Sequence, residues 1–127
     1  MNDVYPNRGR LAAVAMDGAG KLWVIDDANP TRLTKVDPAT GATISSITLT
    51  NAMGTSYVTY YSDLQVVAGA DMSLNGVNVP VGSLLLFNGY VNPDRVVAID
   101  PGTGGVIASA SLALLGNYDL SGGTYDA

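Results

Sequence analysis

Short stretches of apolar and β-branched residues alternate along this chain with polar segments rich in Gly, Pro, Asn and Asp. Apolar stretches of this length are typical of strands, and no stretch shows the 3.6-residue period of a capped helix. We therefore predict an all-β chain with almost no helix. The pattern places strands near residues 10–16, 21–26, 32–37, 43–49, 64–80, 84–89, 95–100 and 106–112.

Turn residues between these stretches indicate antiparallel hairpins. The pattern Asp-Pro-x-Thr-Gly occurs at residues 37–41 and again at 100–104. Proline presets the backbone for a turn, Asp and Thr oxygens accept local amides, and Gly accepts a positive φ. Asn75-Gly76 is a two-residue hairpin signal, so the long stretch 64–80 can itself fold back as a hairpin. The stretches 43–49 and 106–112 suit strands at a sheet edge.

An internal repeat covers the predicted strands 32–37 and 43–49 and returns at the strands 95–100 and 106–112. Residues 29–49 return as residues 92–112, with ten of the 21 positions identical. Four antiparallel strands repeated at this spacing are the pattern of propeller blades. We predict one unit over residues 1–127, made of blade-like repeats at about 10–50 and 64–115 and the first strand of a further blade at 117–127.

The repeated motifs resemble bacterial β-propeller repeats of the NHL and YVTN kind. The resemblance rests on Leu22-Trp23-Val24-x-Asp26, followed by Val36-Asp37-Pro38-x-Thr40-Gly41-x-x-Ile44, and on their second copy from Leu84 to Ile107. Similar repeats occur within large secreted or surface-attached bacterial proteins. This resemblance implies a propeller fold, whereas the functions that propellers carry are diverse.

Composition narrows the classes of function. The formal net charge is −5, with six basic residues, so the chain repels polyanions, and we expect neither nucleic acid nor an anionic membrane surface as a partner. No apolar run has the roughly 18 residues that a membrane span needs. Neither His nor Cys is present. Their absence excludes Ser-His-Asp and Cys-His catalysis and histidine-based zinc or iron sites, so we expect no enzyme.

Acidic residues near the predicted loops are candidates for calcium binding. Asp26 and Asp27 follow the Trp23 stretch, and Asp94 lies in the corresponding second loop. Calcium prefers oxygen ligands, but Asx side chains also cap turns, and neither loop has the alternating carboxylates of a dedicated calcium loop. We therefore expect no cofactor and keep calcium as an alternative.

Arginine and aromatic residues are the remaining candidates for ligand or interface contacts. Arg32 and Arg95 share one repeat position and can bind a ligand carboxylate or pair with a loop carboxylate such as Asp27 or Asp94. Trp23 lies within a strand pattern, where burial competes with stacking on a sugar. The connection between the repeats carries three further aromatic residues that can pack between blades or form a contact surface, namely Tyr57, Tyr60 and Tyr61.

Closed propellers have four to eight blades, and this chain carries about two. We therefore expect a structural or interaction module of a secreted or cell-surface bacterial protein, which associates with itself head to tail through its strand edges into a ring or filament. The export signal is expected outside this segment. The alternatives are a small oligomeric carbohydrate-binding propeller and a fragment of a larger propeller enzyme.

Overall fold

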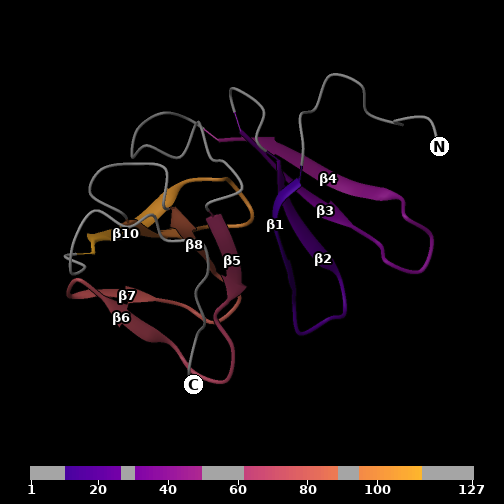
Figure 1. Cartoon of the computed structure of the whole chain (residues 1–127). Coiled ribbons are helices and arrows are strands. Elements are labelled where there is room, and N and C mark those ends of the chain that lie inside the picture. The colour runs from indigo at the N-terminus through magenta and orange to yellow at the C-terminus, as the bar shows by residue number, and fades with distance from the viewer. Residues whose placement is uncertain (1–10, 27–30, 50–61, 89–94, 113–127) are drawn as a thin grey trace.

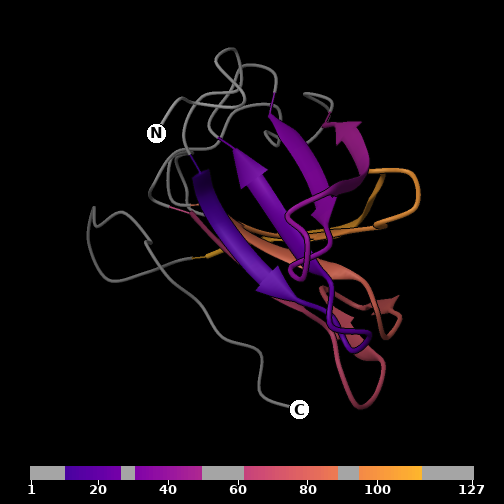
Figure 2. The ribbon, with the colours of Figure 1, turned by 90° about the vertical axis from the view of Figure 1, so that its right-hand side faces the viewer.

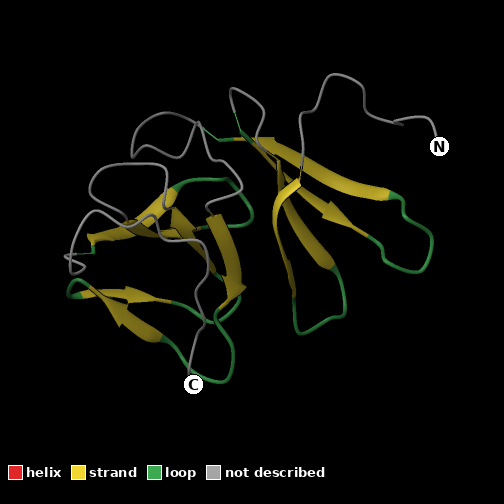
Figure 3. Cartoon of the chain, viewed as in Figure 1, coloured by secondary structure: helices red, strands yellow, loops and turns green. Residues whose placement is uncertain are grey.

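The computed structural model describes residues 11–26, 31–49, 62–88 and 95–112, and the fold below refers to these residues (Figure 1). Within them all regular structure is strand and no helix occurs (Figure 3). Every strand pairing is antiparallel. The predicted all-β class is therefore confirmed for the described part of the chain.

The first half of the chain forms a four-stranded antiparallel sheet, called sheet 1 here. Its strands follow one another in space as they do in sequence, so the sheet is a meander. They are β1 (Leu11–Met16), β2 (Leu22–Asp26), β3 (Arg32–Val36) and β4 (Thr43–Thr48). The strands agree with the predicted ranges to within a residue or so.

The second half forms another four-stranded sheet, called sheet 2, in the order β10-β9-β8-β5. Its strands are β5 (Ser62–Val66), β8 (Leu84–Asn88), β9 (Arg95–Ile99) and β10 (Val106–Ser111). Between β5 and β8 the chain forms a separate two-stranded hairpin of β6 (Met72–Leu74) and β7 (Val77–Val79). The stretch predicted at 64–80 thus divides into the end of β5 and this hairpin.

The described residues form two four-stranded sheets and a hairpin, and they do not close into a ring. The edge position predicted for the stretches 43–49 and 106–112 is correct, because β4 and β10 each end a sheet. The further blade expected at 117–127 lies outside the described residues.

The repeated turn has the same hydrogen bonds in both copies. The amide of Gly41 donates to the carbonyl of Asp37 at 2.7 Å, and that of Gly104 to the carbonyl of Asp100 at 2.8 Å. Both glycines have positive φ, 73° and 75°, a conformation that glycine adopts without a Cβ penalty. The turn therefore fixes which residues of sheets 1 and 2 occupy equivalent positions.

The connection from the first to the second strand differs greatly in length between the two sheets. In sheet 1 it is a short turn, closed by the amide of Asp17 donating to the carbonyl of Lys21 at 2.9 Å. In sheet 2 the amide of Val67 donates in the same way to Ser83, also at 2.9 Å. The hairpin β6–β7 lies between these two residues, so it is an expansion of that turn.

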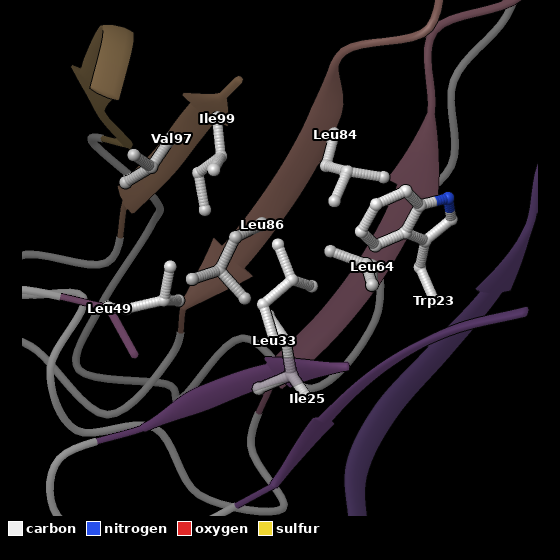
Figure 4. Close-up of a cluster of buried hydrophobic side chains, with 9 residues drawn as sticks. All are labelled: Trp23, Ile25, Leu33, Leu49, Leu64, Leu84, Leu86, Val97 and Ile99. Carbon is white, nitrogen blue, oxygen red and sulfur yellow. The ribbon is translucent and has the colours of Figure 1, made fainter. Parts of the chain in front are cut away.

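The two sheets pack face to face around the main hydrophobic core (Figure 4). Sheet 1 contributes its Trp23 face, which we define as Trp23, Ile25 and Leu33. Sheet 2 contributes its Leu86 face, defined by Leu64, Leu84, Leu86, Val97 and Ile99. All eight side chains are at most 6% exposed, and burial of apolar area on this scale is the main stabilising contribution to folding.

The opposite side of sheet 2 is covered by the β6–β7 hairpin. This Leu85 face, defined as Leu85, Val96 and Ala98, forms a second core with Leu74 and Val79 of the hairpin. The amide nitrogen Nδ2 of Asn75, at the hairpin tip, donates to the carbonyl of Ser109 in β10 at 3.3 Å. Sheet 2 is consequently covered on both faces.

Candidate interaction surface

Trp23 lies in β2 and is 6% exposed. Its indole Nε1 donates to the Asp17 carboxylate at 3.0 Å. The Nζ of Lys35 lies 5.2 Å from the centre of the ring, a cation–π distance. Trp23 therefore belongs to the core between the sheets and offers no ring face for stacking on a sugar.

Asp17 joins the β1–β2 turn to this core. Its Oδ1 accepts the amides of Ala19 and Lys21, both at 2.9 Å. Burial by itself raises the pKa of Asp17, but the Lys21 amide, the Trp23 indole, the Ala19 amide and the Lys35 charge together hold the pKa below its ordinary value. The charged form of Asp17 thus stabilises the turn and orients Trp23.

Asp26 and Arg32, both predicted as site residues, pair with each other. The Arg32 Nε lies 3.7 Å from Asp26 Oδ2, and the Arg32 amide donates to Asp26 Oδ1 at 3.2 Å. Asp26 is 5% exposed, and this pair accounts for its burial. The expected carboxylate pairing of Arg32 is therefore made by Asp26, whereas the partner anticipated for it was Asp27.

Arg95 occupies the equivalent position in sheet 2, but its surroundings differ. The residue opposite it on β8 is Asn88, an amide that is 1% exposed. The carboxylate that Arg32 has across the strand pair is therefore replaced in sheet 2 by a neutral side chain. The two arginines therefore differ in the residue that faces them across the strand pair.

The other predicted site residues lie outside the described part of the chain. They are Asp27 and Asp94, proposed for calcium, and Tyr57, Tyr60 and Tyr61, proposed for a contact surface. Among the residues that are described, no group of three or more His, Cys, Asp or Glu side chains is arranged to hold a metal ion. Of the calcium candidates, Asp26 is the one that lies within the described residues.

An apolar surface on the outer side of sheet 1 was not predicted. We call it the open face and define it as Val14, Met16, Leu22, Val24 and Val36. Cross-strand pairing aligns Met16, Leu22 and Val36 in one row and places Val14 beside Val24. Because successive side chains point to opposite sides of a sheet, this set lies opposite the Trp23 face. Val14 is 51% exposed and Met16 60%.

No strand of the described ranges lies over the open face, which is turned toward the viewer in Figure 2. Its equivalents in sheet 2 have a different environment. The rows Val66-Leu84-Ile99 and Leu64-Leu86-Val97 have the same cross-strand positions, and they face sheet 1. The open face is thus the repeat equivalent of a surface that in sheet 2 is buried against another sheet.

The strand edges were the surfaces that the sequence led us to expect for assembly. β1 and β5 lie side by side where the sheets meet, and β10 lies next to the hairpin. Of the edge strands, β4 has the most exposed side chains, because five of its six residues are exposed. It contains no charged residue or proline, the two kinds of residue that commonly block edge pairing.

Sequence reasoning missed the open face because the alternation in β1 is weak. Leu11-Ala12-Ala13-Val14-Ala15-Met16 is apolar throughout, so its pattern does not say which side faces the core. The signal that identifies the face is the repeat itself, because equivalent positions in sheet 2 are Leu, Ile or Val. That signal becomes usable only when the cross-strand register is known.

Comparison with protein-family models, with curated proteins and with solved structures finds no match for this chain. In the described part of the chain, no helix is long and apolar enough to cross a membrane.

Proposed function

We propose that this chain is a structural or interaction module that associates with itself through surfaces of sheet 1. The observation that carries the proposal is that sheet 1 keeps an apolar face and an uncharged edge exposed to solvent, whereas sheet 2 is covered on both faces. Exposed apolar patches and unblocked strand edges favour contacts with other proteins. A catalytic role has little support, because the chain contains neither His nor Cys.

We further propose that the two sheets are consecutive blades of a propeller-type array. Three observations support this. Each sheet is a four-stranded meander, and the turns and registers of the two sheets repeat. The Trp23 face of sheet 1 packs on the Leu86 face of sheet 2, which is the repeat equivalent of the open face and not of the Trp23 face. Stacking of that kind leads from blade to blade in a propeller. The sequence resemblance is what supports a secreted or cell-surface bacterial protein as the setting of such a module.

Two surfaces of sheet 1 are available for self-association. Pairing through β4 would join the edges of different sheets and extend copies head to tail into a ring or filament. Contact through the open face would bury apolar side chains. The carbohydrate-binding alternative has less support, because the described aromatic candidate, Trp23, is buried between the sheets.

The test is the solution mass of the purified chain, measured by light scattering after gel filtration at several concentrations. We expect the mass to rise above 13.0 kDa as the concentration increases. A monomer at every concentration would contradict self-association. A glycan array run in parallel tests the alternative, and saturable binding of a sugar by a monomeric chain would favour a lectin-like role.

A further inference from the structure

We propose that the open face of sheet 1 pairs with the open face of a second copy of this chain, about a twofold axis. This inference rests on the proposed self-association and specifies its surface and its symmetry. It differs from head-to-tail joining through strand edges, because pairing of identical faces closes after two copies.

The residues of the open face indicate what kind of surface it can contact. In sheet 2 the equivalent rows contain Leu64, Leu84, Leu86, Val97 and Ile99, which are at most 1% exposed against sheet 1. Sheet 1 retains apolar residues at four of these five positions, the exception being Thr34 opposite Val24. A four-stranded sheet is therefore the kind of partner that this face fits, as in sheet-on-sheet packing generally.

The other faces of the two four-stranded sheets are already covered within one copy. The Trp23 face of each copy is covered by sheet 2, and the Leu85 face is covered by the β6–β7 hairpin. The Leu86 face lies against sheet 1. Of the faces of the two four-stranded sheets in the described structure, the open face alone has no strand over it, so it is the four-stranded face through which two folded copies can pack.

The β4 edge is a weaker candidate for contact than the open face. Amides and carbonyls at a strand edge in water are hydrogen-bonded to solvent, so pairing two edges exchanges one set of hydrogen bonds for another. The register shift between Lys35 and Val36 opposite β4 is an irregularity of the kind that disturbs edge pairing. Val14 and Met16, in contrast, gain from burial. The charged residues on the same side of sheet 1, Asp26 and Arg32, lie at the ends of β2 and β3 away from the Met16 row and are paired with each other.

The size of the face predicts how strong the pairing is. A sheet of four strands spans roughly 19 Å across and 17 Å along its strands, so two such faces bury at most on the order of 800–1,000 Å² of accessible surface together. This is below the roughly 1,200 Å² at which stable specific interfaces begin. We therefore expect a dimer that dissociates on dilution.

The first test is sedimentation of the full chain over a wide concentration range. Wild type should move between one and two chain masses, whereas Val14→Lys should weaken the dimer by at least about tenfold, as expected for a charge placed within an apolar contact. Val81→Lys is the matched control, because Val81 is 50% exposed and lies outside the open face. Ser45→Glu, on the β4 edge opposite Lys35, should leave the dimer unchanged.

The second test uses the absence of cysteine from the chain. Under mild oxidation, Val24→Cys should form a covalent dimer, because residues near a twofold axis meet their own copies, and Val81→Cys should not. Far-UV circular dichroism verifies that each variant is folded. An open-ended series of masses that Ser45→Glu abolishes and Val14→Lys does not would overturn the paired-face inference and leave self-association standing. A monomer at all concentrations would overturn both.

Discussion

Sheets 1 and 2 are the same meander in two environments. The cross-strand rows Val14-Val24-Thr34 and Leu64-Leu86-Val97 occupy equivalent positions. In the first row Val14 is exposed and Val24 half-buried, whereas all three residues of the second row are buried. Strand sequence and register are therefore not what distinguishes them. The rows differ because sheet 1 packs on the second row, whereas no strand of the described ranges packs on the first. The other sides of the two sheets differ through the connection after the first strand, where a tight turn in sheet 1 corresponds in sheet 2 to the hairpin that covers the Leu85 face.

This comparison shows that a repeat can change its exposed surface without changing its sheet. Both connections are closed by the same hydrogen bond, Asp17 to Lys21 and Val67 to Ser83. The inserted residues fold over the Leu85 face and bury it with Leu74 and Val79. Loops tolerate such insertions because the entropy of closing a loop rises only slowly with its length.

The largest effect should follow from making the two connections alike. Replacing residues 67–83 by the sequence of residues 17–21 removes the hairpin and exposes the Leu85 face. We expect the free energy of unfolding to fall by about 5 kcal/mol, most of the stability of a small domain, as measured by urea denaturation. Any folded fraction should form an open series of masses, because the Leu85 face is equivalent to the Trp23 face and can pack on the open face. An unchanged urea midpoint would show that the hairpin does not stabilise sheet 2.

A paired truncation tests the two environments directly. Leu86 is fully buried and Val24, its equivalent, is half-buried. Leu86→Ala should lower the free energy of unfolding by about 3 kcal/mol, because it removes buried atoms and leaves a cavity, and Val24→Ala by less than about 1 kcal/mol. Urea denaturation at a concentration where wild type is monomeric measures both. Equal losses would contradict the assignment of the open face.

Gly41 and Gly104 occupy the same position in the repeated turn but have different surroundings. Gly41→Ala should cost about 1 kcal/mol, the usual penalty for a Cβ at positive φ. A Cβ at Gly41 meets nothing within 4 Å, whereas one at Gly104 would lie 2.6 Å from Ile47 Cγ2. Gly104→Ala should therefore lower the unfolding free energy by about twice as much or more, since sheet 1 must shift. Thermal unfolding of the two variants checks this order, and equal midpoints would contradict the contact between the β9–β10 turn and Ile47.

The smallest effect concerns acid sensitivity, which the two sheets should not share equally. The pKa of Asp17 is lowered in the folded state, and its equivalent in sheet 2 is the uncharged Val67. A lowered pKa contributes stability that is present above the unfolded value and is lost as the pH falls through the folded value. We expect the urea midpoint to drop between pH 5.5 and pH 2.5 and Asp17→Asn to reduce that drop.

The same pH range includes two other carboxylates. The Ala39 amide and then Lys21 lower the pKa of Asp37, and the Val81 amide and then Asn78 lower the pKa of Asp71. Asp17→Asn should therefore diminish the acid effect without removing it. An Asp17→Asn variant with the full wild-type pH dependence would contradict the role assigned to Asp17.

Local signals in the sequence were enough to predict the strands and several turns. Asp-Pro-x-Thr-Gly and Asn75-Gly76 have the backbone that their residue types require, with φ values of 52° for Asn75 and 79° for Gly76. The burial of Trp23 was anticipated as the competing role for that residue. These predictions succeeded because each depends on a few neighbouring residues.

The contacts that determine which sheet faces are buried could not be predicted from such local signals. The pairing of β5 with β8 joins strands separated by the hairpin, and the covering of the Leu85 face depends on how the hairpin docks. Asp17 was not singled out, because its bond to Trp23 exists only when the turn has closed. Each of these depends on tertiary packing, which overrides local preference.

Trp23 is the only tryptophan of the chain, and it lies between the sheets, on the side away from the open face. Its fluorescence therefore reports on the separation of the sheets and not on contacts made at the opposite surface. Dilution that dissociates a dimer should leave the emission maximum unchanged, whereas unfolding should shift it to longer wavelength as the indole meets water. The protein thus carries an intrinsic optical signal that separates loss of assembly from loss of fold without any added label.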